Sequence, residues 1–308
     1  MRVLVTGATG FVGGRLIPAL MGDDHEVTVL VRDADRYRED HPAEGVRIVE
    51  GDLLEPGSFE DALDVEAAYY LVHSMRSGAD FEERDRRAAR NFARAASEAG
   101  VERVVYLGGL GEERDELSSH LRSRREVESI LGEGDYHLTT LRAAIIIGAG
   151  STSFDMITQL ASRLPVMVTP RWVQNDCQPI AIGDAVAYLT GVLSAPETAG
   201  GTYEIGGPDV LTYGAMLERT AGLLGRRLFI IPVPVLTPRL STYWVDLVTD
   251  VPKSVAHPLI LGLKNPVVVT DDAITEHVQV SLTPFEEAAA AALAERGHAV
   301  SRRDPGEQ

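Results

Sequence analysis

The chain has 308 residues, of which 44% are hydrophobic and 24% are charged, and its formal net charge at pH 7 is −17. A chain of this length and composition buries a sizeable core without disulfides or metal ions, which excludes the disordered and fibrous classes. The acidic balance argues against a protein that binds nucleic acid by neutralising phosphates, and against docking on an anionic membrane through a basic face.

Lysine is scarce among the basic residues. Lys253 and Lys264 are the two lysines among 29 lysines and arginines. A salt-rich cytosol favours an excess of acids with few lysines, because a screened net charge costs little and keeps the protein soluble. The composition therefore predicts a halophilic protein. A GC-rich genome, which also favours arginine over lysine, is the alternative explanation.

The sequence carries no sign of export or of membrane insertion. Cys177 is its one cysteine, so an internal disulfide is excluded, as suits a reducing cytoplasm. The N-terminus lacks the basic-then-apolar organisation of a signal peptide, and no uncharged apolar stretch is long enough to span a bilayer. These features predict a cytoplasmic protein that is not integral to a membrane.

The first half of the chain alternates short apolar runs with amphipathic runs. The apolar runs predict strands at residues 2–6, 27–31, 47–50, 67–72, 101–107 and 138–147. Helices are predicted at residues 11–20, 81–99 and 119–131. Continuous apolar strands that alternate with helices indicate an α/β fold with a doubly wound parallel sheet, covered on both faces. The ligand site of such a sheet lies at the carboxyl ends of its strands, where the strand order reverses.

The second half has a different rhythm, because prolines break it into short pieces. We predict a smaller, mostly helical region laid over the sheet, with one or two further strands at residues 179–182 and 202–205. The expected division is a sheet domain at residues 1–150, completed by about residues 178–195, a substrate or lid region at 151–177 and 196–300, and a frayed tail at 301–308.

The strongest motif is the glycine-rich run at residues 6–13, TGATGFVG. Gly7, Gly10 and Gly13 lie three apart, directly after a strand and at the start of a helix. One glycine must allow the tight turn, one must let the backbone approach a pyrophosphate, and one must let the helix pack on the strand. The phosphates would then meet backbone N–H groups and the positive end of the helix dipole. The alternative is a glycine turn in a fold that binds no nucleotide. The other residues that we expect at the cofactor here are Thr9, Phe11 and Val12.

The tip of the second strand is where the adenosine ribose would be read. Arg32 lies closer to the strand tip than Asp33, so a 2′-phosphate fits better than a bare 2′-hydroxyl, and Arg36 could add a second cation. We therefore predict a preference for NADP(H), with NAD(H) as the alternative. The competing interpretation of Arg32 is a solvated surface charge.

The end of the third strand offers an adenine contact. Asp52, followed by Leu53, would lie near the adenine, where its carboxylate could accept a hydrogen bond from the amino group. A turn residue or helix cap is the alternative for Asp52.

Several of these motifs together resemble the extended or atypical short-chain dehydrogenase/reductase superfamily. They are the glycine motif, the Gly51-Asp52-Leu53 tripeptide, Asn91, and Leu141-Arg142 leading to residues 148–150. Within that superfamily, four segments resemble the NmrA-like NAD(P)H-binding proteins, which are similar to the NADPH-binding accessory subunit of respiratory complex I. The four segments are YLVHSM at residues 70–75, HLRSR at 120–124, PRW at 170–172 and GLKNP at 262–266. The likeness covers residues 1 to about 272 and implies a Rossmann fold that binds NAD(P)H.

The sequence departs from the superfamily at the catalytic residues. Active members use a Ser or Thr after the fifth strand and a Tyr-x-x-x-Lys motif on the next helix, in which the tyrosine transfers the proton and the lysine lowers its pKa and holds the ribose. Here the serine position aligns with Gly109, and the helix motif aligns with His120-x-x-x-Arg124. The spacing of four still keeps both side chains on one helix face.

Two interpretations of this departure are open. In the first, Arg124 binds the ribose or a phosphate and His120 acts as a general acid near neutral pH. In the second, the usual catalysis is lost and the domain binds NADPH without turning it over. A surface histidine at the start of a helix is a further alternative for His120.

The loop after the fourth strand corresponds to the family's loop that contacts the cofactor ribose. The resemblance implies this role for Val72, His73 and Ser74. His73 also invites a metal role, but no second ligand stands at metal spacing, so we expect no metal. Further residues that could line an apolar substrate cleft over the nicotinamide, with ordinary core packing as the alternative, are Met75, Trp172, Tyr243 and Trp244.

We therefore predict an NADP(H)-binding protein that, if active, transfers hydride to an apolar carbonyl or quinone-like compound. The alternative is a non-catalytic redox sensor or assembly subunit, whose partner would be another protein. A sugar-nucleotide epimerase is a third candidate, although it normally needs the same missing tyrosine. A homodimer is also expected, since many relatives associate through helices that flank the sheet.

Overall fold

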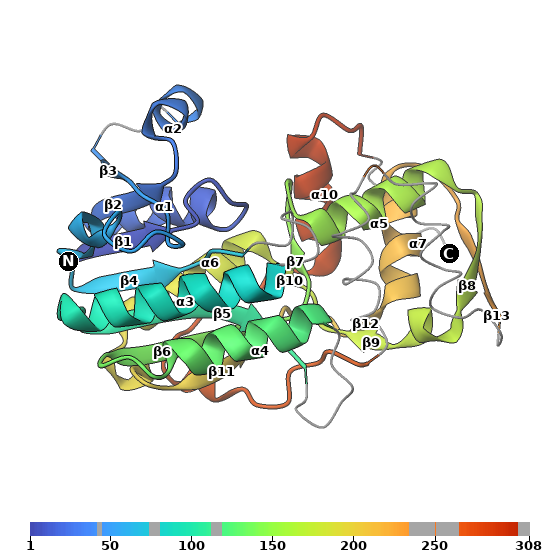
Figure 1. Cartoon of the computed structure of the whole chain (residues 1–308). Coiled ribbons are helices and arrows are strands. Elements are labelled where there is room, and N and C mark those ends of the chain that lie inside the picture. The colour runs from blue at the N-terminus through green and yellow to red at the C-terminus, as the bar shows by residue number, and fades with distance from the viewer. Residues whose placement is uncertain (42–44, 74–80, 112–118, 234–249, 251–264, 301–308) are drawn as a thin grey trace.

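A seven-stranded parallel sheet forms the centre of the computed structural model, which describes residues 1–41, 45–73, 81–111, 119–233, 250 and 265–300. Its strands run in the order β11-β6-β5-β4-β1-β2-β3 (Figure 1). Their bounds are Arg2–Thr6 for β1, Glu26–Val31 for β2, Arg47–Glu50 for β3, Ala67–Tyr70 for β4, Arg103–Gly109 for β5, His137–Ala143 for β6 and Thr202–Ile205 for β11. This arrangement confirms the predicted doubly wound α/β fold.

The predicted strands fall on the observed ones, with shifts at their ends. The strand expected at residues 101–107 lies two residues later, as β5, and the helix expected at 11–20 begins two residues later, as α1 (Gly13–Gly22). The run at residues 138–147 divides into β6 and the short β7 (Ile146–Ile147). The ends of these strands and helices are set by glycine-rich turns and by hydrogen bonding between neighbouring strands. The hydrophobic pattern alone does not locate them.

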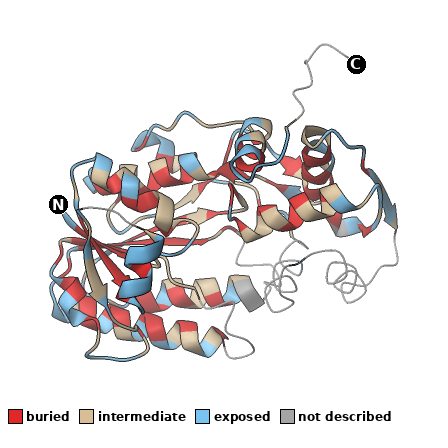
Figure 2. Cartoon of the chain, turned by 90° about the horizontal axis from the view of Figure 1, so that it is seen from above, coloured by how far each residue is buried: buried red, intermediate tan, exposed pale blue. Residues whose placement is uncertain are grey.

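Helices cover both faces of the sheet. On one face, α1 packs beside α6 (Ile182–Ser194), and on the other α3 (Phe81–Glu98) packs beside α4 (Ser119–Leu131) (Figure 1). Successive strand residues point to opposite faces, so Val3 and Val5 join the core under α1 and α6, whereas Leu4 joins the core under α3 and α4. Buried residues accordingly gather where the helices face the strands (Figure 2).

The remaining elements near the sheet are short. They are α2 (Ala34–Asp40) between β2 and β3, and the 3-10 helices η1 (Glu60–Leu63), η4 (Pro196–Thr198) and η5 (Ala273–Glu276).

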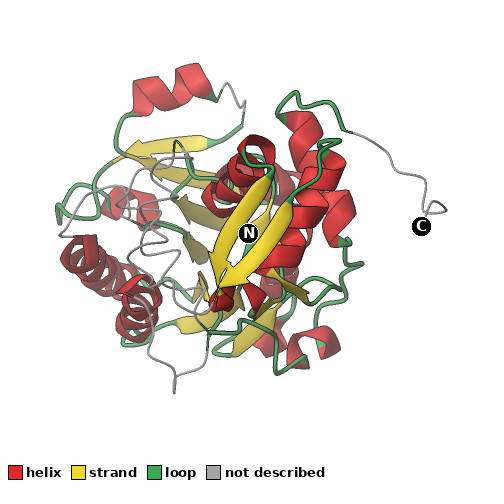
Figure 3. Ribbon diagram, turned by 90° about the vertical axis from the view of Figure 1, so that its right-hand side faces the viewer, coloured by secondary structure: helices red, strands yellow, loops and turns green. Residues whose placement is uncertain are grey.

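A second region lies beyond the carboxyl ends of the strands and has its own core, built from residues such as Phe154, Met216 and Leu293. Its helices are α5 (Thr152–Arg163), α7 (Tyr213–Leu223), α10 (Phe285–Glu295) and the 3-10 helix η3 (Arg171–Gln174). Three two-stranded sheets join them: β7 with β10 (Ile180–Ala181), β9 (Asp176–Cys177) with β12 (Leu211–Thr212), and β8 (Val166–Pro170) with β13 (Phe229–Val233). Figure 3 shows the last pair at the front of the molecule.

Two expectations for the second half need correction. The region contains more strands than the one or two expected, because short runs on either side of the prolines pair with one another. The strand at residues 202–205 does not belong to a lid but pairs with β6 as the edge of the central sheet. A sheet domain that stops at residue 195 would therefore omit one of its own strands.

The frayed tail expected at residues 301–308 lies outside the described residues. None of the helices in the described part of the chain combines the length and the apolar character that crossing a bilayer requires.

Candidate functional site

The strand order reverses next to β1, which has β2 on one side and β4 on the other. Connections leave in opposite directions at such a point, and sheets of this kind bind their ligands there, at the carboxyl ends of the strands. The predicted glycine motif follows β1, and the predicted ribose loop follows β4. The topology therefore brings these two sequence-predicted segments to one edge of the sheet.

The glycines are required by close contacts between backbone segments. Gly7 has a φ of +72°, and a Cβ at this residue would lie 2.7 Å from the carbonyl oxygen of Leu71, just after β4. A Cβ at Gly13 would lie 2.3 Å from the carbonyl oxygen of Gly7. Real Cβ atoms do not approach backbone atoms so closely, so both positions exclude every residue but glycine.

The start of α1 is suited to an anion. Gly10 donates its N–H to the carbonyl of Gly7 at 2.9 Å, which folds the turn back on itself, and Thr9 and Gly10 are exposed. The N-cap residue, Val12, offers no side-chain oxygen to the first helical N–H groups. Such N–H groups, together with the helix dipole, bind phosphates well. The turn therefore fits the pyrophosphate of a dinucleotide.

Phe11 extends from this turn toward the second region. Its ring lies 2.9 Å from the position that a Cβ at Gly148 would take, and the guanidinium of Arg15 lies 4.9 Å from the ring centre. Arg15 also donates to the carbonyl of Ala149 at 2.7 Å and pairs with Glu295 of α10. These contacts link the glycine turn to the loop after β7 and to α10.

The acidic side chains at the tip of β2 are engaged by backbone groups. Asp33 is the N-cap of α2 and accepts the N–H of Arg36 at 2.9 Å. Glu50, the last residue of β3, accepts the N–H of Ala34 at 2.9 Å. Arg32 is exposed, and the side chain of Arg36 lies 3.6 Å from Asp40 one turn along the helix. Both carboxylates are thus engaged at the start of α2, while Arg32 is exposed at the tip of β2.

Asp52 takes part in a turn. Its carboxylate accepts the N–H of Leu54 at 2.9 Å, and its backbone N–H is bonded to Ser58. The side chain of Asn91, on α3, donates to the carbonyl of Leu53 at 2.8 Å and so fixes this loop to the helix. One carboxylate oxygen of Asp52 is therefore engaged within the turn, as the alternative interpretation of Asp52 as a turn residue predicts.

A histidine–carboxylate pair lies after β4. Nδ1 of His73 is 2.7 Å from Oδ2 of Asp85, which lies in the first turns of α3. The His73 side chain is 15% exposed and that of Asp85 only 3%. Sequence reasoning singled out His73 but missed Asp85, because that carboxylate stands in the charged run at residues 82–87 and looks like part of a solvated helix face.

Arg124, on α4, comes close to this pair. It donates to the carbonyl of Leu107 at 2.9 Å, at the carboxyl end of β5, and the hydroxyl of the buried Tyr106 donates to the carbonyl of Arg124 at 3.1 Å. Burial and the positive charge of Arg124 lower the pKa of His73, and the hydrogen bond and charge of Asp85 oppose this shift only in part. The structure therefore brings together His73 and Arg124, which the sequence predicted from separate motifs.

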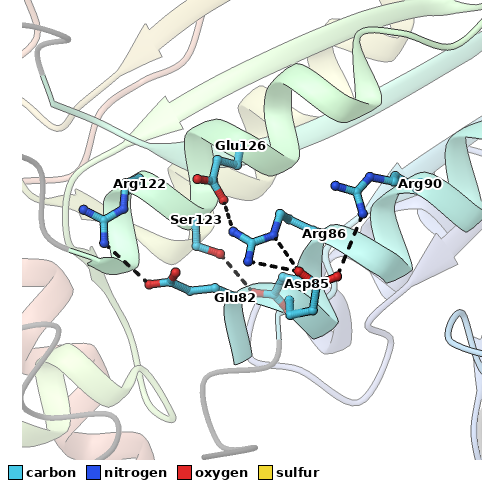
Figure 4. Close-up of polar contacts among 8 residues, drawn as sticks. Glu82, Asp85, Arg86, Arg90, Arg122, Ser123 and Glu126 are labelled. Carbon is cyan, nitrogen blue, oxygen red and sulfur yellow. Dashed lines mark hydrogen bonds and ion pairs between the residues drawn. The ribbon is translucent and has the colours of Figure 1, made fainter. Parts of the chain in front are cut away.

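Ion pairs hold α3 and α4 together around the buried carboxylate (Figure 4). The hydroxyl of Ser123 lies 3.5 Å from Oδ2 of Asp85, between the two helices. Arg86 of α3 pairs with Glu126 of α4 at 2.7 Å, and Arg122 of α4 lies 3.7 Å from Glu82 of α3. These pairs are partly exposed and contribute little stability each, so their main effect is to fix the relative position of the helices.

At Gly109, the position that the resemblance aligns with the catalytic serine, one side chain crowds the space that a Cβ would take. A Cβ at Gly109 would lie 2.7 Å from Cδ2 of Leu121 on α4. A serine there would require Leu121 to move. Gly109 thus lacks the hydroxyl of a serine and also leaves room for the side chain of Leu121.

Several predicted site residues lie outside the part of the chain that the structure describes. Ser74, Met75, Tyr243 and Trp244 are not among the described residues, and only the backbone is described for His120, in the first turn of α4, and for Trp172, in η3. Among the residues that are described, no three histidine, cysteine or acidic side chains are grouped so as to hold a metal ion.

Comparisons with known proteins agree with this geometry. A profile of the family described as NAD(P)H-binding matches residues 7–158. The chain is 28% identical over 239 residues to the ceramide reductase of Caulobacter vibrioides, a match that covers 75% of this chain and 73% of that protein. It is 27% identical over 224 residues to the mitochondrial NADH dehydrogenase (ubiquinone) 1 alpha subcomplex subunit 9 of Dictyostelium discoideum, covering 70% of this chain and 61% of that protein. The second match spans less than two thirds of that relative's own length. Together with the profile, the two relatives confirm the resemblance to NAD(P)H-binding proteins that the motifs predicted.

Solved structures support the same fold. The triphenylmethane reductase of Citrobacter sp., solved in complex with NADP(H), superposes with a TM-score of 0.76 over 95% of this chain and 100% of that chain, at 19% identity. At this level of identity the likeness establishes the architecture only.

Proposed function

Because a profile of the NAD(P)H-binding family matches residues 7–158, we propose that this chain is an NADPH-dependent oxidoreductase of the atypical short-chain dehydrogenase/reductase type. The observation that carries the proposal is the turn after β1, where Gly7 and Gly13 leave no room for a Cβ and α1 begins without a side-chain cap. Such a turn is costly to maintain unless the backbone must approach a ligand closely.

The cofactor would be held along the edge formed by β1, β2 and β4. The glycine turn would bind the pyrophosphate, Arg32 with Arg36 the 2′-phosphate, and the loop after β4 the nicotinamide ribose. Bound NADPH supplies a hydride to the substrate. We favour NADP(H) over NAD(H) because the carboxylate of Asp33, which would read a 2′-hydroxyl, already caps α2.

The substrate we propose is an apolar carbonyl or quinone-like compound. The similarity to a protein named for its action on ceramide, an apolar lipid, supports an apolar substrate. The side chains of Met75, Trp172 and Trp244 remain our candidates for the lining of its cleft.

A non-catalytic role is the second candidate. The chain lacks the Tyr-x-x-x-Lys motif, a glycine, Gly109, stands at the expected serine position, and one relative carries the name of a subunit of NADH dehydrogenase. In this case the protein would bind NADPH and report its presence to a protein partner.

Isothermal titration calorimetry with NADPH, NADP⁺ and NADH tests the proposal, in molar KCl because of the net charge of −17. We expect NADPH to bind at least tenfold more tightly than NADH. Reduction of phenanthrenequinone, followed as loss of NADPH absorbance, would then separate the enzyme from the binding module. If none of the three nucleotides binds, the proposed function is wrong.

A further inference from the structure

We propose that His73 and Asp85 form the proton-donating pair of this oxidoreductase, with His73 in the role that tyrosine has in other members of the superfamily. The inference rests on the proposed function and adds a catalytic residue to it. It also replaces His120 as the leading candidate for the general acid.

The pair lies at the edge of the sheet where the reaction would occur. His73 follows the end of β4 by three residues, and Leu71, two residues before it, is in contact with Gly7 of the cofactor turn. Asp85 approaches from α3, and Arg124 approaches from α4, the helix that carries the catalytic motif in other members. Three separate segments thus converge beside the candidate nicotinamide site.

The geometry assigns a role to each ring nitrogen. A carboxylate as deeply buried as that of Asp85 needs a hydrogen-bond donor, and Nδ1–H of His73, at 2.7 Å, supplies one. This bond fixes the orientation of the ring, as in other carboxylate–histidine pairs. Nε2 is on the opposite side of the ring from Asp85, so proton transfer to a substrate would occur through Nε2.

The tyrosines near the site are poorly placed for this role. Tyr70 and Tyr106 are at most 2% exposed, and the hydroxyl of Tyr106 donates to the carbonyl of Arg124. Burial raises the pKa of both residues. His73 is the more accessible group and the one whose ordinary pKa lies near neutrality.

The reaction balances with one hydride and one proton. The hydride forms a C–H bond at the carbonyl carbon of the substrate, and the electron pair of the C=O π bond moves to the oxygen. That oxygen takes the proton from Nε2 of imidazolium His73, which becomes neutral and regains a proton from water. Arg124 and Asp85, the charged groups that face His73 from α4 and α3, set how readily the ring gives up this proton.

The direction of the pH dependence follows from this role. Only the protonated ring can donate, and its pKa lies below the usual histidine value of 6.5. Reduction should therefore speed up as the pH falls through that pKa, whereas oxidation of the corresponding alcohol should speed up as the pH rises.

Three glutamine variants of the full-length protein test the pair: His73→Gln, His120→Gln and His137→Gln. His137 is exposed at the start of β6, at the opposite edge of the sheet, and serves as the matched control. We expect His73→Gln to lose at least 100-fold in kcat for reduction of phenanthrenequinone and to lose the acid-side pH dependence, with NADPH affinity changed less than threefold. Proton transfer by a positioned side chain is worth about 100- to 10,000-fold. His137→Gln should stay within threefold of the unmodified protein, and His120→Gln should lose far less activity than His73→Gln.

A second readout does not depend on turnover. Side-chain ¹⁵N NMR of the histidines in the cofactor-free protein should show Nδ1 of neutral His73 protonated, and its Nε2 resonance should shift when NADPH is added. An Asp85→Asn variant should change the titration midpoint of His73 while the protein stays folded.

The outcomes separate the two proposals. If NADPH does not bind, both the proposed function and the role of the pair are wrong. If NADPH binds but the Nε2 resonance of His73 stays unchanged, or His73→Gln reduces the probe as fast as His137→Gln does, the pair is not the proton donor and the proposed function stands. A large loss in His120→Gln instead would return the role to that residue.

Discussion

The glycine turn after β1 and the loops after β4 and β5 lie at the same edge of the sheet, but they differ in what fixes them. The turn is defined by backbone contacts, since a Cβ at Gly7 or Gly13 would fall within 2.7 Å of a carbonyl oxygen. The loops after β4 and β5 are held instead by side-chain contacts, chiefly those of His73 with Asp85 and of Arg124 with the carbonyl of Leu107.

This difference gives a physical reason why the glycine motif matches that of the short-chain dehydrogenase/reductase superfamily while the Tyr-x-x-x-Lys motif is absent. A phosphate cradle made of backbone N–H groups has few alternatives in sequence, because only glycine fits the turn. A proton donor can be any side chain of suitable pKa at the right distance from the reacting oxygen. The absence of Tyr-x-x-x-Lys therefore excludes one solution and not the reaction.

The largest expected effect is at the backbone-defined turn. Gly13→Ala should abolish detectable NADPH binding, a loss of at least about 100-fold, because the new Cβ would displace the carbonyl of Gly7 from its position. Gly22→Ala is the control, since a Cβ at that position of the same helix meets no atom within 4 Å. Calorimetric titration of both variants checks this. Equal NADPH affinity in the two would show that close backbone packing at the turn is irrelevant to binding.

The next effect concerns the stability of the side-chain site. Asp85→Ala should lower the free energy of unfolding by about 1–3 kcal/mol, because it removes the buried carboxylate that lies 2.7 Å from Nδ1 of His73. Asp64→Ala removes a carboxylate that is 75% exposed in its ion pair with Arg2, and should cost less than about 1 kcal/mol. Urea denaturation measures both. A cost for Asp85→Ala as small as that of Asp64→Ala would mean that the pair is not a structural unit.

A smaller effect is expected at the ribose end of the turn. Arg32→Ala should weaken NADPH binding about tenfold, which corresponds to about 1.4 kcal/mol, and leave NADH binding unchanged. Arg38→Ala is the control, because it removes an exposed arginine of α2 that pairs with Asp35. The selectivity ratio from parallel titrations decides this prediction. An equal loss for both nucleotides would contradict a contact with the 2′-phosphate.

The smallest effect is the pH dependence of stability. The pKa of His73 is lowered in the folded protein, so the unfolded chain takes up this proton first as the pH falls below 6.5. His73 therefore contributes stability above that pH and loses the contribution as the pH falls through the folded-state pKa. Melting temperatures of the unmodified protein and of His73→Gln, compared from pH 7.5 to about pH 5, test this. His73→Gln should show the shallower decline, and a steeper one would contradict the direction of the shift.

Much of the fold follows from the sequence, because apolar runs such as residues 2–6 and 202–205 match observed strands. What failed was assigning the second of these to its sheet. The run TYEI at residues 202–205 is short and half polar, and its pairing with β6 depends on a partner about 60 residues away in sequence. Periodicity reports which segments are extended but not which strand each one joins.

The site shows the same limit. The glycine turn was predictable because its residues are consecutive and its chemistry is local. The pairing of His73 with Asp85 was not, because twelve positions separate them and a buried aspartate in a run of charged residues has no distinctive pattern. The signal that could have found it is the apolar stripe of α3, which continues from Phe81 through Asp85 to Ala88 and Phe92 and so places the carboxylate toward the core.

Transfer of deuterium from the cofactor to a product tests most directly whether the glycine turn and the side-chain site of His73 and Asp85 act together in catalysis. The protein would be incubated with NADPH deuterated at the hydride-donating carbon and with a panel of apolar aldehydes and ketones, and the products analysed by mass spectrometry. We predict alcohols that carry the deuterium, formed far more slowly by His73→Gln than by His137→Gln. Tight NADPH binding without deuterium in any product would contradict the proposed activity and favour a protein that binds NADPH without using it.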